Sequence, residues 1–133
     1  MKNWEIGQQF TGRAERIELV DLVKYAGASG DYNPLHFDET YAKSKGQPSV
    51  LIHGMLGAGI LSTLLTDFAG TEGFVKSIDV RFVKTMPVNS RLLSKAQVIT
   101  INPLQNGTEY TVNLWLENEQ GETTIKGNAC IFI

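Results

Sequence analysis

The stretch LIHGMLGAGILSTLLTDF, residues 51–68, decides the fold. Apolar side chains cover every side of its helical projection, which is the pattern of a helix buried on most sides. No charged residue occurs from Pro48 to Thr66, close to the length of a membrane-spanning helix. Proline, histidine and several glycines interrupt that run, so its reliably apolar part is too short to span. We therefore predict a buried helix at the centre of the core, with these apolar residues: Met55, Leu56, Ala58, Ile60, Leu61, Leu64 and Leu65.

Beyond this helix the hydrophobic period changes to two. Alternating sets over 78–82, 110–116 and 125–133 predict strands with one buried face, and a less regular strand covers about 92–101. Asn106-Gly107 and Gln120-Gly121 supply turns, and a strand near Gln9 to Arg16 is an additional possibility. Helices followed by strands in 133 residues predict an α+β fold, a single domain over residues 1–133. A curved antiparallel sheet would wrap around the helix that begins near His53.

Two shorter helices are predicted before the central one. Residues 17–28 place four apolar side chains at helical spacing, with Glu18 and Asp21 in the first turn, where negative charge suits the helix dipole. Gly27 and Gly30 are plausible stop signals. Residues 38–45 form a short helix opened by Asp38. The four apolar positions of the first helix are Leu19, Leu22, Val23 and Ala26.

Composition excludes several classes of partner and points to the cytosol. The 12 basic and 14 acidic residues are scattered and give a net charge of -2, so nothing indicates nucleic acid or an anionic membrane surface. One cysteine, Cys130, permits no internal disulfide and is interpreted as a packing residue. The opening MKNWEIGQQF lacks the apolar run of an export signal, so we expect a cytoplasmic protein.

The stretch GDYNPLH, residues 30–36, holds the strongest candidate pair for chemistry, Asp31 and His36. Residues five apart lie far from each other around a helix axis, and a proline disfavours helical dihedrals in the residue before it. A loop bounded by Gly30 and containing Pro34 can instead fold both side chains over one atom. Taken alone, an aspartate in this setting is usually a turn residue that bonds nearby backbone amides, and a lone histidine is usually a surface or hydrogen-bonded core residue.

A second histidine favours a functional role for this loop over ordinary turn chemistry. His53 precedes Gly54 at the predicted start of the buried helix, where backbone amides lack intrahelical acceptors and can hold a developing negative oxygen. Two histidines and two carboxylates, those of Asp31 and Asp38, could in principle bind zinc or iron. Because no pair has the one-turn spacing of familiar metal motifs, we predict neither a metal nor another cofactor.

Two blocks resemble a known family. Residues 25–36, YAGASGDYNPLH, and then His53-Gly54-Met55-Leu56 are similar to the MaoC-like (R)-specific enoyl-CoA hydratases and related acyl-thioester dehydratases of the hot-dog fold. The resemblance implies a sheet wrapped around a long helix and a homodimer or larger homo-oligomer with active sites near the subunit interface. It assigns Asp31 and His36 as the catalytic pair and the Gly54 amide as the oxyanion hole. It also assigns supporting positions, namely Asn33 and Ser62.

The resemblance implies an enzyme that hydrates trans-2-enoyl-CoA to (R)-3-hydroxyacyl-CoA, or catalyses the reverse dehydration. The substrate would be an acyl thioester of CoA or of acyl carrier protein. Two alternatives stay open at this point: a hot-dog thioesterase, and a subunit of a heteromeric hydroxyacyl-thioester dehydratase.

Overall fold

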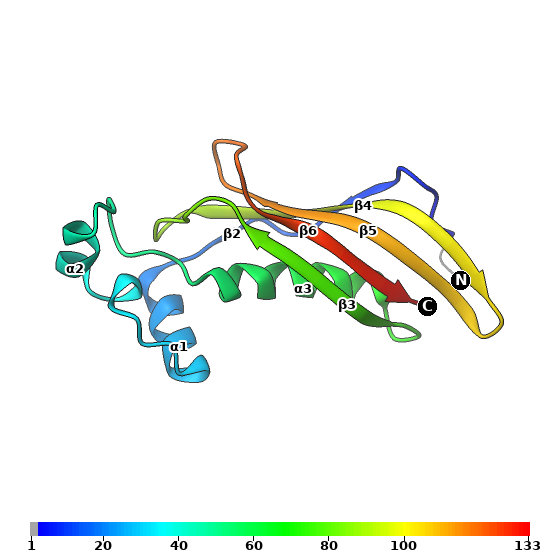
Figure 1. Ribbon diagram of the computed structural model, residues 1–133, viewed down its shortest axis with the longest axis horizontal. Helices are drawn as coiled ribbons and strands as arrows, with labels where there is room; N and C mark the ends of the chain where they lie inside the picture. The colour runs from blue at the N-terminus through cyan, green and yellow to red at the C-terminus, as the bar shows by residue number, and fades with distance from the viewer. Residues whose placement is uncertain (1–2) are drawn as a thin grey trace.

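The computed structural model describes residues 3–133, and the predicted helices and strands are found in the predicted order (Figure 1). The helical part holds α1 (Leu19–Ser29), the one-turn helix η1 (Pro34–His36), α2 (Glu39–Ser44) and the long α3 (Gly54–Ala69). The strands are β1 (Gln9–Thr11), β2 (Glu15–Arg16), β3 (Phe74–Phe82), β4 (Arg91–Leu104), β5 (Gly107–Glu117) and β6 (Thr123–Phe132). The N-terminal strand expected near residues 9–16 is therefore present as two short pieces.

The strands form one antiparallel sheet in the order β1-β4-β5-β6-β3, with β2 paired to β4. The chain order β4-β5-β6 follows from two hairpins. The turn between β4 and β5 is one residue earlier than the predicted Asn106-Gly107: it consists of Gln105 and Asn106, and Gly107 opens β5 opposite Leu104. The sheet curves along one side of α3, while α1 and α2 lie together beyond the N-terminal end of α3 (Figure 1). The α+β prediction is thus confirmed.

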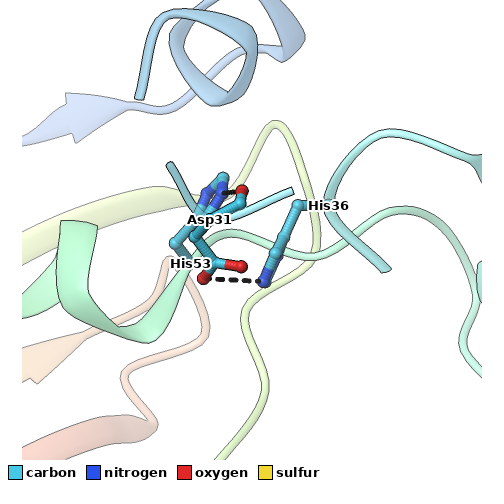
Figure 2. Close-up of side chains that lie close together, drawn as sticks. All are labelled: Asp31, His36 and His53. Carbon is cyan, nitrogen blue, oxygen red and sulfur yellow. Dashed lines mark hydrogen bonds and ion pairs between the residues drawn. The ribbon is translucent and has the colours of Figure 1, made fainter. Parts of the chain in front are cut away.

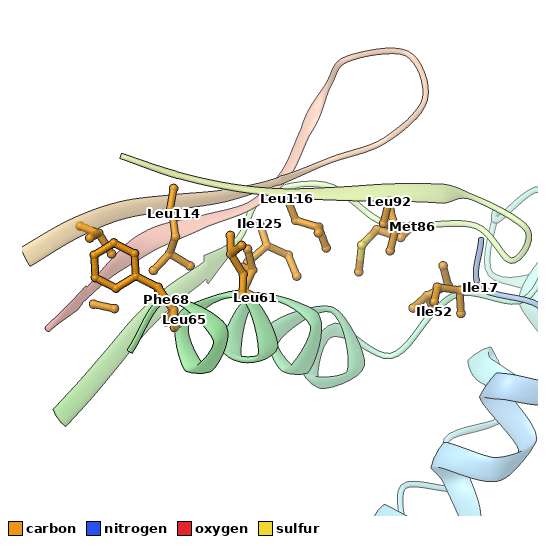
Figure 3. Packing of buried hydrophobic residues seen from close by; sticks show 14 of the residues in the cluster. Ile17, Ile52, Leu61, Leu65, Phe68, Met86, Leu92, Leu114, Leu116 and Ile125 are labelled. Carbon is orange, nitrogen blue, oxygen red and sulfur yellow. The ribbon is translucent and has the colours of Figure 1, made fainter. Parts of the chain in front are cut away.

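The core lies between α3 and the inner face of the sheet. Leu61 and Leu65 of α3 are fully buried and face strand residues such as Leu114, Leu116 and Ile125 (Figure 3). Burying each such side chain contributes roughly 1.5–3 kcal/mol, so this layer is a main source of stability. No helix within residues 3–133 is long and apolar enough to cross a membrane.

One face of α3 is exposed, and the prediction of a helix apolar and buried on most sides needs correction there. Met55 is 62% exposed, and positions 59, 63, 66 and 67 on the same side are exposed as well. In α1, likewise, Leu22 and Ala26 are buried, but Leu19 and Val23 are more than half exposed. Helical spacing located these apolar faces correctly, but it did not show that part of each face is left uncovered by residues 3–133.

The edge strand β3 is a second correction. Ile78 and Phe82 lie on its inner face, which the alternating pattern predicted to be buried, yet they are 40% and 51% exposed. The reason is topological, because β3 pairs with β6 on one side and has no neighbouring strand on the other among the described residues. An exposed apolar edge of this kind is open to pairing with another chain.

The extended segment Val50–His53, called the bridging segment below, connects the α1–α2 region to the rest of the molecule. Its odd-numbered residues contact η1 and the loop before it: the Leu51 N–H donates to the Leu35 carbonyl at 2.9 Å, and His53 contacts Asp31. Its even-numbered residues bond the opposite side, since the Ile52 N–H donates to the carbonyl of residue 86 and the Val50 carbonyl accepts from the N–H of residue 88. Alternation along an extended backbone therefore gives the segment two distinct bonding sides.

The two glycines predicted as stop signals in α1 differ in role, and matched substitutions should separate them. Gly27 lies inside the helix with no heavy atom within 4 Å of an added Cβ, whereas Gly30 caps the helix at φ +77°. Gly27→Ala is expected to raise the free energy of unfolding by about 0.4–1 kcal/mol, because glycine is costly inside a helix. Gly30→Ala is expected to lower it by about 1 kcal/mol, because an L side chain is strained at that φ. Urea unfolding of both variants tests this, and equal shifts would contradict the assignment.

Candidate active site

A series of short-range hydrogen bonds shapes the loop between α1 and η1. The Asp31 N–H donates to Ser29 Oγ at 3.1 Å, the Asn33 N–H donates to Asp31 Oδ1 at 3.2 Å, and the Leu35 N–H donates to Asn33 Oδ1 at 3.0 Å. These are the side-chain-to-backbone turns that serine, aspartate and asparagine favour. They hold one carboxylate oxygen of Asp31 on the backbone and leave the other directed away from the turn.

That second oxygen faces His36, as the spacing argument predicted. Asp31 Oδ2 lies 3.8 Å from His36 Nε2, with the aspartate side chain 50% exposed and the imidazole 13% exposed (Figure 2). On the other side of the ring, His36 Nδ1 lies 2.8 Å from the Leu51 carbonyl. A carbonyl only accepts, so Nδ1 carries a proton and, in the neutral ring, Nε2 presents its lone pair toward Asp31. Both members of the pair thus offer a proton acceptor to the same space.

The ring of His53 lies against this pair, which the sequence did not indicate. The His53 and His36 rings are stacked, with centroids 3.8 Å apart and planes 19° apart, and His53 Nε2 lies 3.3 Å from the Asp31 backbone carbonyl (Figure 2). Tyr25 of α1 meets the His53 ring edge-on at a centroid distance of 4.7 Å. Burial, followed by the nearby His36, lowers the pKa of His53 below its usual range. The lowered pKa favours the neutral form of the His53 ring at neutral pH.

Gly54 begins α3, and its position leaves backbone donors available. The N-cap residue, His53, makes no side-chain cap, and of the first-turn amides of α3 that of Leu56 has an acceptor, the His53 carbonyl at 3.1 Å. The Gly54 and Met55 amides have neither an intrahelical nor a capping acceptor among residues 3–133. Gly54 and His36 both line a cavity of about 320 Å³. A Cβ added at Gly54 would lie 2.9 Å from the Phe82 ring, which lines the same cavity. Gly54 therefore borders a cavity that His36 also lines.

The supporting residues predicted by resemblance lie in different surroundings. Asn33 is in the loop itself, where its side chain caps η1 and its N–H binds Asp31. Ser62 is half-buried on α3, and within residues 3–133 no hydrogen bond joins its side chain to Asp31 or His36. A structural role for Asn33 follows from its bonds, whereas the role of Ser62 stays a prediction.

Three side chains at this site are of types that can bind a metal ion. Ligand atoms of Asp31, His36 and His53 lie within 4.8 Å of one another, while Asp38, the other carboxylate considered from the sequence, caps α2 instead. Lone pairs of imidazole nitrogens lie in the ring plane, so two stacked rings direct them side by side and not toward one ion. His36 Nδ1 and His53 Nε2 each already face a carbonyl. This geometry suits proton transfer better than metal binding.

Comparison with known proteins assigns the chain to a family. The model of the MaoC-like domain matches residues 2–120, and the chain belongs to that family. It is 25% identical over 126 residues to the (R)-specific enoyl-CoA hydratase of Rhodospirillum rubrum, covering 94% of this chain and 85% of that protein. It is 38% identical over 90 residues to the peroxisomal enoyl-CoA hydratase 2 of Arabidopsis thaliana, covering 66% of this chain but only 29% of that protein.

The fold comparison agrees with the family. The (R)-hydratase from A. caviae superposes with a TM-score of 0.88 at 22% identity, covering 98% of both chains. The hot-dog fold expected from the two sequence blocks is therefore confirmed over nearly the whole chain.

Proposed function

We propose that the protein hydrates trans-2-enoyl-CoA to (R)-3-hydroxyacyl-CoA, or catalyses the reverse dehydration. One observation supports this best: Asp31 Oδ2 and His36 Nε2 face each other at a distance of 3.8 Å, beside the cavity that Gly54 lines. The Asp31 carboxylate and the His36 imidazole offer two proton acceptors to the same space, close to unpaired backbone N–H groups at the start of α3. This arrangement suits the addition of water to an alkene that is conjugated to a thioester. Family membership and the named hydratase relatives support the same class of reaction.

The proposed chemistry balances with the groups present. A water molecule held between Asp31 and His36 bonds through its oxygen to the β-carbon of the enoyl thioester, while one of its protons passes to the pair. Electron density moves to the thioester oxygen, which the Gly54 amide stabilises; removing one such donor typically costs about 10²–10³-fold in kcat. The α-carbon then receives a proton from the pair, and the overall reaction consumes one water.

The test is an assay that separates the candidate reactions. Purified protein is incubated with crotonyl-CoA, loss of the enoyl absorbance and release of free CoA thiol are followed in parallel, and the product is analysed on a chiral column. Loss of absorbance with an (R)-3-hydroxy product and no free thiol is expected. Thiol release instead would favour the thioesterase alternative, and activity only after a second chain is added would favour the heteromeric dehydratase.

We also propose that two copies of the chain associate through β3, whose last residue, Phe82, lines the cavity. The inner face of β3 is apolar and exposed at Ile78 and Phe82, and Phe82 lines the cavity beside Gly54. A partner strand would cover this edge and add surface to the cavity. This supports the expectation that the active sites lie near a subunit interface.

Charge at this edge should weaken the association. Ile78→Lys is expected to shift the protein from dimer to monomer in sedimentation velocity at micromolar concentration, because the lysine would have to be buried without a partner. Leu104→Lys is the matched control, since Leu104 is similarly exposed, at 46%, but lies at the far end of β4. Unchanged sedimentation of Ile78→Lys would contradict an interface at β3.

A single functional domain and a cytosolic location complete the proposal. One cluster of buried residues runs from Ile17 to Ile131, which supports a single domain. The lone Cys130 suits a reducing compartment.

A further inference from the structure

His53 contacts both members of the candidate catalytic pair, although the proposed reaction assigns it no step. Its ring is 1% exposed, its flat face stacks on His36, and its Nε2 lies 3.3 Å from the Asp31 carbonyl. Within residues 3–133, Nδ1 of the same ring is buried without a hydrogen-bond partner. A buried polar atom left unpaired is uncommon and calls for a reason.

The two nitrogens define the form of the ring. Because the Asp31 carbonyl can only accept, Nε2 carries the proton, and Nδ1 of the neutral ring has a bare lone pair. Protonation would turn Nδ1 into a buried donor with no acceptor, which costs more than an unused lone pair. The titratable groups that face the ring are Asp31, His36 and Tyr25, from the loop, η1 and α1.

Neutrality of His53 matters to its neighbour. His36 becomes positive when Nε2 takes a proton from water, and the face of a neutral aromatic ring accommodates a cation. A second cation at a centroid distance of 3.8 Å would oppose that step. A neutral ring at this place therefore allows His36 to change its charge, while also fixing the plane in which Nε2 points.

We propose that His53 is a positioning residue: a permanently neutral imidazole that holds the His36 ring by stacking and the Asp31 backbone by one hydrogen bond, so that both acceptors meet one water. This inference rests on the proposed hydration for its catalytic meaning. The charge and the tautomer of the His36 and His53 rings, however, can be measured without an activity assay.

Histidine NMR provides the first test, because the chain has only two histidines. In wild-type protein labelled with ¹⁵N-histidine, we expect His36 to be the Nδ1–H tautomer and His53 to be the Nε2–H tautomer. The His53 ring should stay neutral as the pH falls below 6.5. Every variant at position 53 leaves a single ring signal, that of His36, which makes the assignment unambiguous. A His53 ring that is charged at pH 6.5 or above would overturn the proposal.

Three variants then separate the two contacts. His53→Phe keeps a flat ring, His53→Gln keeps an N–H at the place of Nε2, and His53→Ala keeps neither. For His53→Ala we expect kcat for crotonyl-CoA to fall at least about tenfold with KM changed less than about threefold, the pattern of a lost transition-state arrangement. Phe and Gln should each restore part of kcat, and the His36 tautomer should become mixed in His53→Ala alone.

Two results would count against positioning. A folded His53→Ala variant with wild-type kcat and a single His36 tautomer would show that neither contact matters. Equal losses in all three variants, with the His36 tautomer unchanged, would reduce His53 to a packing residue. If wild-type protein failed to hydrate crotonyl-CoA while the NMR result held, the proposed function would be at fault and the arrangement of the two rings would stand.

Discussion

Asp31→Asn is expected to lower kcat for crotonyl-CoA hydration by at least about 100-fold, because a carboxamide cannot accept the proton of the attacking water. The loop should keep its shape, since an asparagine Oδ1 can still accept the Asn33 N–H that Asp31 Oδ1 accepts at 3.2 Å. Steady-state kinetics, together with thermal unfolding of the same preparation, measures both expectations.

Asp38→Asn is the matched control for that substitution. Asp38 is also exposed and also binds a backbone N–H, that of Tyr41 at 3.1 Å, but it lies outside the pair. Asparagine is as good an N-cap as aspartate, so turnover and stability should stay close to wild type. Near wild-type turnover of Asp31→Asn would remove Asp31 from the proton-accepting role.

His36→Asn is expected to lower kcat by a similar factor, about 10²–10⁴-fold, because the lone pair at Nε2 is lost. The substitution is chosen for its geometry: an asparagine amide nitrogen can occupy the place of Nδ1, which lies 2.8 Å from the Leu51 carbonyl. The bond to the bridging segment can therefore persist while the acceptor facing Asp31 disappears.

Comparison with His36→Ala separates chemistry from anchoring. Alanine removes the acceptor and also leaves the Leu51 carbonyl unpaired, so only this variant should lose stability, by about 1–3 kcal/mol. If His36→Asn retained most of its turnover while remaining folded, Asp31 alone would have to serve as the acceptor. The proposal of a paired site would then be wrong.

The proximity of Asp31 and His36 was predictable because the forces that create it are local. Gly30 ends the helix in a left-handed conformation, and Asp31 and Asn33 each bind a backbone N–H two residues ahead. The seven residues from Gly30 to His36 therefore contain nearly the whole geometry. The stacking of His53 on His36 was not predictable in this way. It joins two segments 17 residues apart and depends on how the bridging segment approaches the loop.

Burial was predicted less well than secondary structure, for a physical reason. Periodicity identifies which side of an element is apolar, but not whether the same chain covers it. Met55, Val23 and Ile78 are all on predicted apolar faces, and all are exposed in the single chain. The residues whose burial was predicted wrongly lie on α1, α3 and β3. Burying them would require contact with another chain.

The two-sided bonding of the bridging segment makes its length as important as its composition. Removal of one residue between Val50 and His53 would turn the carbonyl now held by His36 toward the loop at residues 86–88, and would turn the His53 ring away from Asp31. Side-chain changes within this segment can therefore be accommodated more readily than a change in its register. Insertions and deletions, which loops ordinarily tolerate, are excluded from these four positions if the pair is to stay assembled.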